Sequence, residues 1–399
     1  MAKLNRAFIV VLDGMGVGEL PDAHLFGDQG ANTFANCAEA VGGLNLPNLQ
    51  KLGMGNIIPI KGIAPAEKPL ASFGKMAEKS PGKDTTTGHW EMAGIVLDHA
   101  FPVFPKFSDE IMDEFTRRTG RGYLGNLPAS GTEILKELGA EHVKTGKWIV
   151  YTSGDSVFQI AAHQDVVPLD ELYNACKIAR EILDPYHVGR VIARPFYGEE
   201  GAYERNQGGR HDYSVPPPAK TLLDYAVDAG REVIGIGKIS DIFAAHGVTR
   251  SLPTASNAEG LATTLRMAHE APDGSLVFNN LVDTDAKYGH RNNPQGMAEC
   301  LAEFDRELGK LVEALKPGDL LIISADHGNE ATDVSTDHTR EYVPLLAYMP
   351  GVPGVDLGTR TGFGDIAQTI AQGWGLEARL EGESFWHQLT PNPVTASTH

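Results

Sequence analysis

The sequence has few cysteines, no long apolar segment and no excess of basic charge. Its 399 residues include only three cysteines, which are far apart: Cys37, Cys176 and Cys300. This number and spacing imply neither a disulfide framework nor a CxxC metal site, so we expect a reducing, cytoplasmic compartment. No apolar run approaches the ~18 residues of a membrane span, and the short run at 7–12 carries no signal-peptide pattern. We therefore expect a soluble protein.

The charge balance excludes several classes of partner. Lys and Arg number 34 against 52 Asp and Glu, which gives a net charge of −18. This argues against binding to nucleic acid or an anionic membrane, because both need a basic face. A phosphorylated small molecule stays possible, since bound divalent metals can reverse the local field. No obligate protein partner is evident from the sequence.

Apolar patterns predict an α/β fold. Apolar runs, typical of strands buried on both faces, occur at residues 8–12, 148–151, 233–236, 276–278 (which leads through 281–282) and 320–323. Helical periodicity appears at residues 169–182, 221–229 and 297–315. Because such strands and helices alternate, we expect a mainly parallel sheet.

Two proline-rich stretches mark possible domain boundaries. They are residues 100–105 and 214–218, and proline clusters disfavour regular structure. We expect a separate domain, residues 99–217, inserted into a core made of residues 1–98 and 218–399. Two proline-rich surface loops in one continuous domain are the alternative.

Acidic residues and histidines follow several of the predicted strands. The residues at these strand ends are Asp13, Asp155, Lys238, Asp285 and Asp326–His327. His290 comes five residues after Asp285, and His338 eleven after His327. Carboxylates and imidazoles without thiolates suit Zn²⁺ or Mn²⁺, and six such groups are enough for a two-metal site. Any one histidine alone could instead be a surface or hydrogen-bonded core residue.

A hydroxyl-rich segment offers a nucleophile. Residues 82–91 read Gly-Lys-Asp-Thr-Thr-Thr-Gly-His-Trp-Glu, and we expect a helix from Glu91 onward. A helix start offers free backbone N–H groups to an anion. A threonine hydroxyl attacks only when a metal or base activates it. A capped threonine-rich loop is the alternative.

These segments together resemble the phosphopentomutase family of the alkaline phosphatase superfamily. The resemblance runs from about residue 6 to residue 348. Its most specific parts are Lys-Asp-Thr-Thr-Thr-Gly-His-Trp-Glu at 83–91 and Thr-Asp-His-Thr-Arg-Glu at 336–341. The sequence matches the family pattern at every metal and nucleophile position.

The resemblance implies a fold and a set of site residues. The fold would be an alkaline-phosphatase-like core, with helices on both faces of the sheet, plus a smaller inserted α/β cap domain at 99–217. One Mn²⁺ would be held by Asp13, Asp326, His327 and Thr85, and a second by Asp285, His290 and His338. Thr85 would be the phosphorylated nucleophile, with Thr87 and His89 nearby. The implied substrate contacts are Ser153, Asp155, Arg190, Arg205 and Lys238, with Arg210 a weaker candidate.

The resemblance also implies a reaction. Ribose 1-phosphate or 2-deoxyribose 1-phosphate would be interconverted with the 5-phosphate, through a phosphothreonine enzyme and a pentose 1,5-bisphosphate. A hexose 1,6-bisphosphate would act as activator. A metal-dependent phosphatase or phosphodiesterase of the same superfamily is the alternative. The cofactor-independent phosphoglycerate mutases use a serine in place of Thr85, and a non-catalytic sugar-phosphate binder would be expected to lack a ligand or the nucleophile.

Overall fold

The chain forms two compact units in the computed structural model, which describes residues 3–153 and 156–390. The first unit comprises Met1–Ala100 and Pro217–His399, and the second comprises Phe101–Pro216. The second unit is therefore inserted within the sequence of the first. Both junctions lie in the proline-rich stretches, close to the expected limits at 99 and 217.

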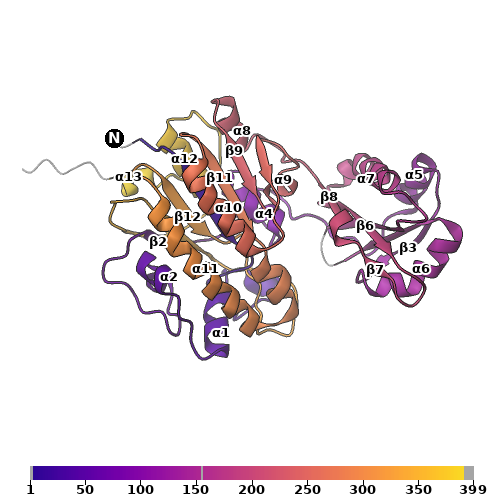
Figure 1. Ribbon diagram of the computed structural model, residues 1–399, viewed down its shortest axis with the longest axis horizontal. Coiled ribbons are helices and arrows are strands. Elements are labelled where there is room, and N and C mark those ends of the chain that lie inside the picture. The colour runs from indigo at the N-terminus through magenta and orange to yellow at the C-terminus, as the bar shows by residue number, and fades with distance from the viewer. Residues whose placement is uncertain (1–2, 154–155, 391–399) are drawn as a thin grey trace, which may run out of the picture. The chain divides into compact units, whose positions relative to one another are not determined.

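The first unit is built on an eight-stranded sheet (Figure 1). In spatial order its strands are β10 (Arg250–Leu252), β9 (Val233–Ile236), β11 (Leu276–Leu281), β1 (Ala7–Leu12), β12 (Leu320–Ser324), β13 (Val343–Tyr348), β2 (Ser72–Met76) and β14 (Asp356–Arg360). Of these described strands, only β13 runs antiparallel to its neighbours. The predicted mainly parallel sheet is confirmed. Every residue of β1 is buried, as expected for a central strand with parallel partners on both sides.

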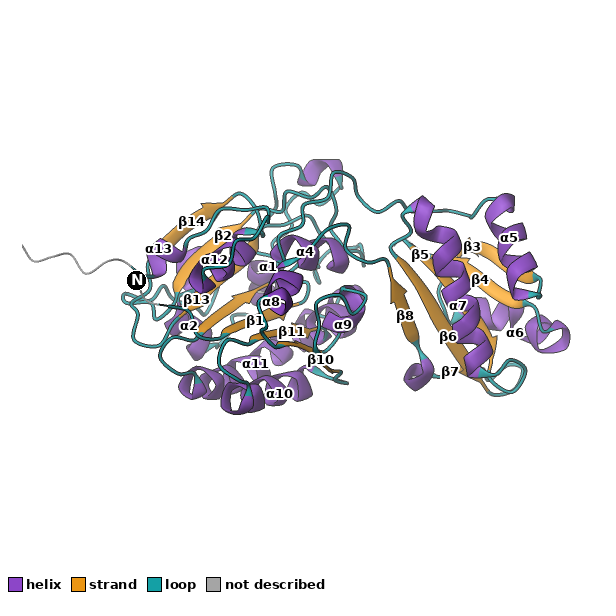
Figure 2. Cartoon of the chain, turned by 90° about the horizontal axis from the view of Figure 1, so that it is seen from above, coloured by secondary structure: helices purple, strands orange, loops and turns teal. Residues whose placement is uncertain are grey.

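Helices cover both faces of this sheet (Figure 2). On one face α10 (Asn257–Glu270) packs beside α11 (Pro294–Ala314), and on the other α4 (Thr85–Met92) contacts α9 (Ile239–Ile242) and α12 (Asp365–Trp374). The remaining helices of this unit are α1 (Thr33–Ala40), α2 (Pro47–Leu52), α3 (Met54–Ile57), α8 (Leu222–Asp228), α13 (Trp386–Leu389), the 3₁₀ turns η1 (Ala23–Leu25) and η5 (Gly289–Arg291), and the π-helix η4 (Thr284–Tyr288).

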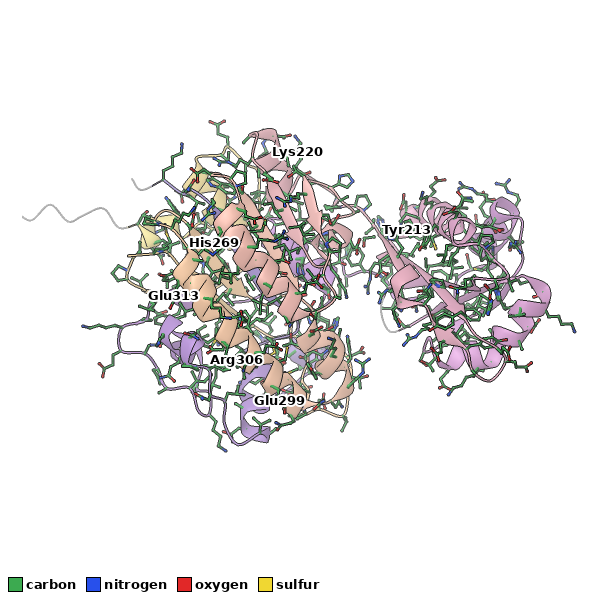
Figure 3. The ribbon with its side chains drawn as sticks, in the orientation of Figure 1. Tyr213, Lys220, His269, Glu299, Arg306 and Glu313 are labelled. Carbon is green, nitrogen blue, oxygen red and sulfur yellow. The ribbon has the colours of Figure 1, made fainter. Side chains whose placement is uncertain are left out.

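The periodicity of α11 is reflected in its burial. Met297, Leu301 and Leu308 are buried against the sheet side. Glu299, Arg306 and Glu313, labelled in Figure 3, are exposed along the opposite face. The predicted helices at 297–315, 169–182 and 221–229 are confirmed in α11, in α7 (Leu169–Leu183) and in α8. None of the helices among the described residues has the length and apolar character needed to cross a bilayer.

The prediction of a helix from Glu91 onward is wrong. Helix α4 begins at Thr85 and ends at Met92, so Glu91 lies in its last turn. Asp84 caps it, because its Oδ1 accepts from the Thr87 N–H at 3.1 Å and its Oδ2 from the Thr87 hydroxyl at 2.5 Å. This cap outweighs the low helix propensity of three consecutive threonines.

The second unit has its own sheet, in the order β3-β4-β5-β6-β7 with β8 paired to β6. Its strands are β3 (Tyr123–Pro128), β4 (Trp148–Thr152), β5 (Val157–His163), β6 (Arg190–Tyr197), β7 (Glu204–Arg205) and β8 (His211–Ser214). Its helices are α5 (Asp109–Thr119), α6 (Glu133–Thr145), α7 (Leu169–Leu183) and the 3₁₀ turns η2 (Asp184–Tyr186) and η3 (Gln207–Gly209). Phe115, Phe158 and Val191 belong to a core with α5 and α7 on one face, while Ile149 and Phe196 pack with α6 on the other.

The predicted strand at 148–151 is confirmed as β4, but it belongs to this second sheet. Ser153 therefore follows a strand of the second unit, within the segment 99–217 that was expected to form a separate domain. Asp155 lies outside the described residues. Apolar composition predicted the strand, but it carries no information on which sheet the strand joins.

Candidate active site

Three adjacent parallel strands bring the acidic residues to one edge of the first sheet. Asp13 follows β1, Asp326 and His327 follow β12, and Asp285 lies in η4 just beyond β11. Because β11, β1 and β12 are neighbours, their carboxyl ends open on the same crevice. The structure brings together the three carboxylates predicted from the strand ends.

His327 lies at the centre of the first cluster. Its Nε2 is 3.4 Å from Oδ1 of Asp13, 3.4 Å from Oδ2 of Asp326 and 3.2 Å from the hydroxyl oxygen of Thr85. Asp13, Asp326 and His327 are all buried. These residues come from three separate segments of the chain, around positions 13, 85 and 326, yet they converge on the hydroxyl of one threonine.

The second cluster surrounds Asp285. Its Oδ2 is 3.2 Å from Nε2 of His290, and its Oδ1 is 3.4 Å from Nε2 of His338. The two clusters adjoin, since the ring of His338 stacks on that of His327 with centroids 3.8 Å apart. Ligand atoms of Asp285, His327 and His338 lie within 4.8 Å of one another, as do those of Asp13, Asp326 and His327. His327 thus belongs to both groups of ligand atoms.

The three histidines are oriented by backbone carbonyls. Nδ1 of His290 is 2.6 Å from the Thr336 oxygen, that of His327 is 3.0 Å from the Gly328 oxygen, and that of His338 is 3.0 Å from the Lys83 oxygen. A carbonyl only accepts, so in the neutral ring Nδ1 carries the proton and Nε2 presents its lone pair to the cluster. Histidines that bind metals are held in the same way.

Two carboxylate oxygens in this cluster have no hydrogen-bond partner. They are Oδ1 of Asp13 and Oδ2 of Asp326, both fully buried. Buried charged oxygens without partners are costly unless a cation compensates them. Together with the imidazole lone pairs, they provide a donor set that fits divalent cations such as Mn²⁺ or Zn²⁺.

The electrostatics of the cluster favour positive charge at its centre. Burial raises the pKa of Asp13, and the charges of Asp326 and Asp285 raise it further. Burial opposes protonation of His327, but Asp326 and Asp13 outweigh it and raise the pKa of His327 well above its usual value. For Asp285, His338 and His290 outweigh burial and hold the pKa well below its ordinary range. A cation bound at this position would be stabilised by the same carboxylate charges.

Thr85 is the first residue of α4, where backbone N–H groups have no partner within the helix. The helix lies close against the end of β12, because a Cβ at Gly88 would be only 2.2 Å from the Asp326 carbonyl oxygen. His89 follows one turn after Thr85, with its Nδ1 2.8 Å from the Thr85 carbonyl oxygen and 3.2 Å from Oδ2 of Asp326. The hydroxyl of Thr87 is engaged by Asp84. Of these hydroxyls, that of Thr85 contacts His327 in the cluster of carboxylates and histidines.

Comparison with known proteins identifies the family. A family model described as Metalloenzyme superfamily matches residues 5–378. The phosphopentomutase of Carboxydothermus hydrogenoformans is 54% identical over 389 residues, which cover 97% of this chain and 100% of that protein. That of Desulfitobacterium hafniense is 53% identical over the same length and coverage. The chain belongs to the phosphopentomutase family. The resemblance drawn from the sequence motifs is confirmed, and with it the predicted isomerase class and fold class.

The solved structures that match this chain are more distant in sequence. The PH0037 protein from Pyrococcus horikoshii has a TM-score of 0.48 and 15% identity, covering 96% of this chain and 100% of that one. A phosphoglycerate mutase from Leishmania mexicana has a TM-score of 0.47 and 12% identity, covering 96% and 97%.

Sequence reasoning missed three residues that form hydrogen bonds to Asp13 and Asp285 in this cluster. Nδ2 of Asn280 donates to Oδ2 of Asp13 at 2.8 Å, and Nδ2 of Asn329 donates to Oδ1 of Asp285 at 2.7 Å. The Thr284 hydroxyl donates to the Asp13 carbonyl oxygen at 2.6 Å. The available signal was the pair of asparagines, Asn279 and Asn280, in the otherwise apolar strand β11 and the asparagine that ends Asp-His-Gly-Asn at 326–329.

The predicted substrate contacts lie in both units. Lys238 precedes α9 at the end of β9 in the first unit. In the second unit, Arg190 begins β6, Arg205 ends β7, and Arg210 pairs with Asp212 through bonds of 2.8 and 2.7 Å. Arg190 lies 3.6 Å from the same carboxylate of Asp212.

Sequence reasoning also missed Arg194 in this group. Its Nε donates to Oε1 of Gln159 at 3.1 Å. Burial, and then the charge of Arg210, lower the pKa of Arg194 to about 10. This part of the second unit therefore concentrates cationic groups in a chain of strongly negative net charge.

Proposed function

We propose that this chain interconverts the 1-phosphate and 5-phosphate of ribose or 2-deoxyribose. The family membership, over nearly the whole chain, supports this reaction. The observation that carries the residue assignment is the Thr85 hydroxyl, which lies 3.2 Å from Nε2 of His327 beside two buried carboxylates. An ordinary threonine is a poor nucleophile, and this environment is one that activates a hydroxyl.

The proposed cofactors are two Mn²⁺ ions. Asp13, Asp326, His327 and Thr85 would hold one of them, and Asp285, His290 and His338 the other. Bound divalent ions neutralise charge on a transferring phosphoryl group. The unpartnered oxygens of Asp13 and Asp326 and the inward lone pairs of the histidines support this assignment.

In the proposed cycle Thr85 begins as a phosphothreonine. The 5-hydroxyl of the pentose 1-phosphate attacks this phosphorus, the bond to the threonine oxygen breaks, and a pentose 1,5-bisphosphate forms. The bisphosphate then reverses its orientation. The Thr85 oxygen attacks the C1 phosphate, which releases the pentose 5-phosphate and restores the phosphoenzyme. The free N–H groups at the start of α4 provide donors for the phosphoryl oxygens.

We propose that the second unit is a cap domain that keeps water from the phosphothreonine. The proposed substrate contacts are Ser153, Asp155, Arg190, Arg205 and Lys238, with Arg210 secondary. Arginines bind a phosphate through two parallel hydrogen bonds, which lysine cannot do. Deleting residues 99–217 should leave some hydrolysis and no isomerisation, whereas retained mutase activity would reject this role.

A coupled assay tests the function. Ribose 1-phosphate supplied with Mn²⁺ should yield ribose 5-phosphate, and chelation should stop the reaction until Mn²⁺ is restored. Release of inorganic phosphate in place of the isomerised sugar phosphate would indicate a phosphatase instead. Activation by a hexose 1,6-bisphosphate can be tested in the same assay, by adding it to dephosphorylated enzyme. Action in the cytoplasm, without an obligate protein partner, stays a prediction.

A further inference from the structure

Arg340 is a buried arginine beside the segment that leads into Thr85. Arg340 is 3% exposed and lies two positions after His338 in the sequence. Its Nη1 lies 2.8 Å from the Ser80 carbonyl oxygen and 2.6 Å from that of Gly82. These contacts join segments about 260 residues apart in the chain.

Carboxylates fix the guanidinium in place. Nη1 of Arg340 is 2.7 Å from Oε2 of Glu78, and Nη2 donates to the Glu78 carbonyl oxygen at 3.0 Å. On the other side, Nε and Nη2 lie 3.2 and 3.1 Å from Oδ2 of Asp22. The planar guanidinium can meet these acceptors at once, whereas the ammonium of a lysine is a point charge.

The same short segment also holds Lys83. Nδ1 of His338 is 3.0 Å from the Lys83 carbonyl oxygen, and the Arg340 N–H donates to Oδ2 of Asp28 at 2.8 Å. Oδ2 of Asp28 in turn lies 2.9 Å from Nζ of Lys83. Residues 338–340 therefore contact the main-chain carbonyls of Gly82 and Lys83, immediately before the cap Asp84 and the nucleophile.

The path of this loop permits little adjustment. A Cβ at Gly82 would lie 2.8 Å from the Thr87 hydroxyl oxygen, so the loop packs tightly on the first turn of α4. Oε2 of Glu91 accepts from both the N–H and the hydroxyl of Ser80, at 2.7 and 2.6 Å. With Ser80 anchored there and Thr87 bonded to Asp84, the contacts of Arg340 determine where the intervening residues lie.

We propose that Arg340 is a positioning residue for the nucleophile. It fixes the 80–84 loop through the Ser80 and Gly82 carbonyls, and so sets the distance between the Thr85 oxygen and His327. The role rests on the proposed phosphothreonine chemistry, but Arg340 is separate from the metal ligands and substrate contacts assigned above. Displacing a reacting atom by about 1 Å can lower a rate by about 100-fold.

The test compares Arg340→Lys with a matched control, Arg6→Lys. Arg6 is also buried, pairs with Asp319 at 2.5 and 2.9 Å, and donates to the Ala268 and Ala271 carbonyls, away from the site. Both substitutions should lower Tm. For Arg340→Lys we expect kcat about 100-fold lower with KM within about twofold of wild type and an unchanged metal content. Hydrogen exchange of residues 79–88 should also become faster. Arg6→Lys should change neither kcat nor that exchange.

An effect confined to Tm, with kcat and exchange unchanged in both variants, would overturn the proposal. So would an equal loss of kcat in Arg6→Lys. If Arg340→Lys fails to fold, Asp22→Asn carries the test, since Asp22 is partly exposed and pairs with the same guanidinium. Its kcat should fall several-fold with KM unchanged, and an unaltered kcat would refute the role. An inactive wild type would instead reject the proposed function, and the exchange comparison would still decide the role of Arg340.

Discussion

Replacing Asp13 with asparagine should have opposite effects on stability with and without metal. The asparagine keeps the shape of the side chain and an acceptor for Asn280, which bonds Asp13 at 2.8 Å. It removes the charge beside His327 and the unpartnered Oδ1. Because a divalent cation needs its anionic ligand, we expect one ion per chain in place of two. The loss of one ion would remove about 4 kcal/mol of electrostatic stabilisation from the transition state, which would lower kcat by about 1000-fold.

Without metal the same substitution should stabilise the fold. The Asp13 and Asp326 ligand atoms lie within 4.8 Å of each other. Two unit charges at such a separation repel by roughly 3–4 kcal/mol at an effective dielectric constant near 20. His327 offsets part of this repulsion, so we expect a gain of about 2 kcal/mol, or about 4 °C in Tm.

The gain should depend on pH. Burial and the neighbouring carboxylates raise the pKa of Asp13 above its ordinary value of 3.8. A raised carboxyl pKa means that the ionised group destabilises the fold at neutral pH and ceases to do so once it is protonated. The advantage of Asp13→Asn should therefore be present at pH 7 and disappear as the pH falls through the raised pKa towards 3.8.

Calorimetry of metal-free and Mn²⁺-loaded protein, with metal content measured in parallel, checks these expectations. Asp319→Asn is the control, because Asp319 is a buried carboxylate paired with Arg6. It should lower Tm with and without metal and leave two ions bound. Two tightly bound ions in Asp13→Asn, or a metal-free variant less stable than wild type, would refute the reasoning.

The remaining predictions concern the nucleophile, its surroundings and the metals. Thr85→Val should accept no ³²P label and show no turnover while most metal binding persists; label on Thr86 or Thr87 would move the assignment. Asn280→Leu should weaken metal binding or activity by about 10- to 100-fold, because it removes the partner of Asp13. Asn279→Leu, whose amide bonds Thr264 instead, should leave metal binding unchanged, and equal effects of the two would contradict this. Chelation should lower Tm and Mn²⁺ should restore it, because bound metal stabilises the folded state; an unchanged Tm would argue against buried metal ions.

Much of the core could be predicted because its strands are fully buried. The run at residues 8–12 has no polar residue, so both the strand and the position of Asp13 at its end could be recognised. The boundaries of α4 could not be predicted, since they depend on a single cap, Asp84, which offsets the low helix propensity of three threonines. Apolar composition alone does not specify the pairing partners of β4, and only the proline-rich stretches at 100–105 and 214–218 indicated that it belongs to a separate unit.

Some residues of the candidate site could also be predicted from the sequence, and others could not. Asp and His are rarely needed for folding at the ends of several strands, so their repeated occurrence there indicated a metal site. Asn280 and Asn329 gave a weak signal, because an amide in a buried segment more often completes a backbone hydrogen bond. Arg194 was missed because a single arginine in a strand gives no indication that Arg205 and Arg210 lie near it in the folded unit.

The carbonyl oxygens that orient His290, His327 and His338 belong to the main chain. A peptide oxygen is present whichever side chain the residue carries, so no substitution at Thr336, Gly328 or Lys83 can delete the group itself. Ring orientation can therefore be lost only if the backbone moves. At Thr336 and Lys83 a change of side chain leaves the carbonyl in place, whereas at Gly328 a Cβ would lie 2.2 Å from Oε1 of Glu341 and the backbone would have to shift.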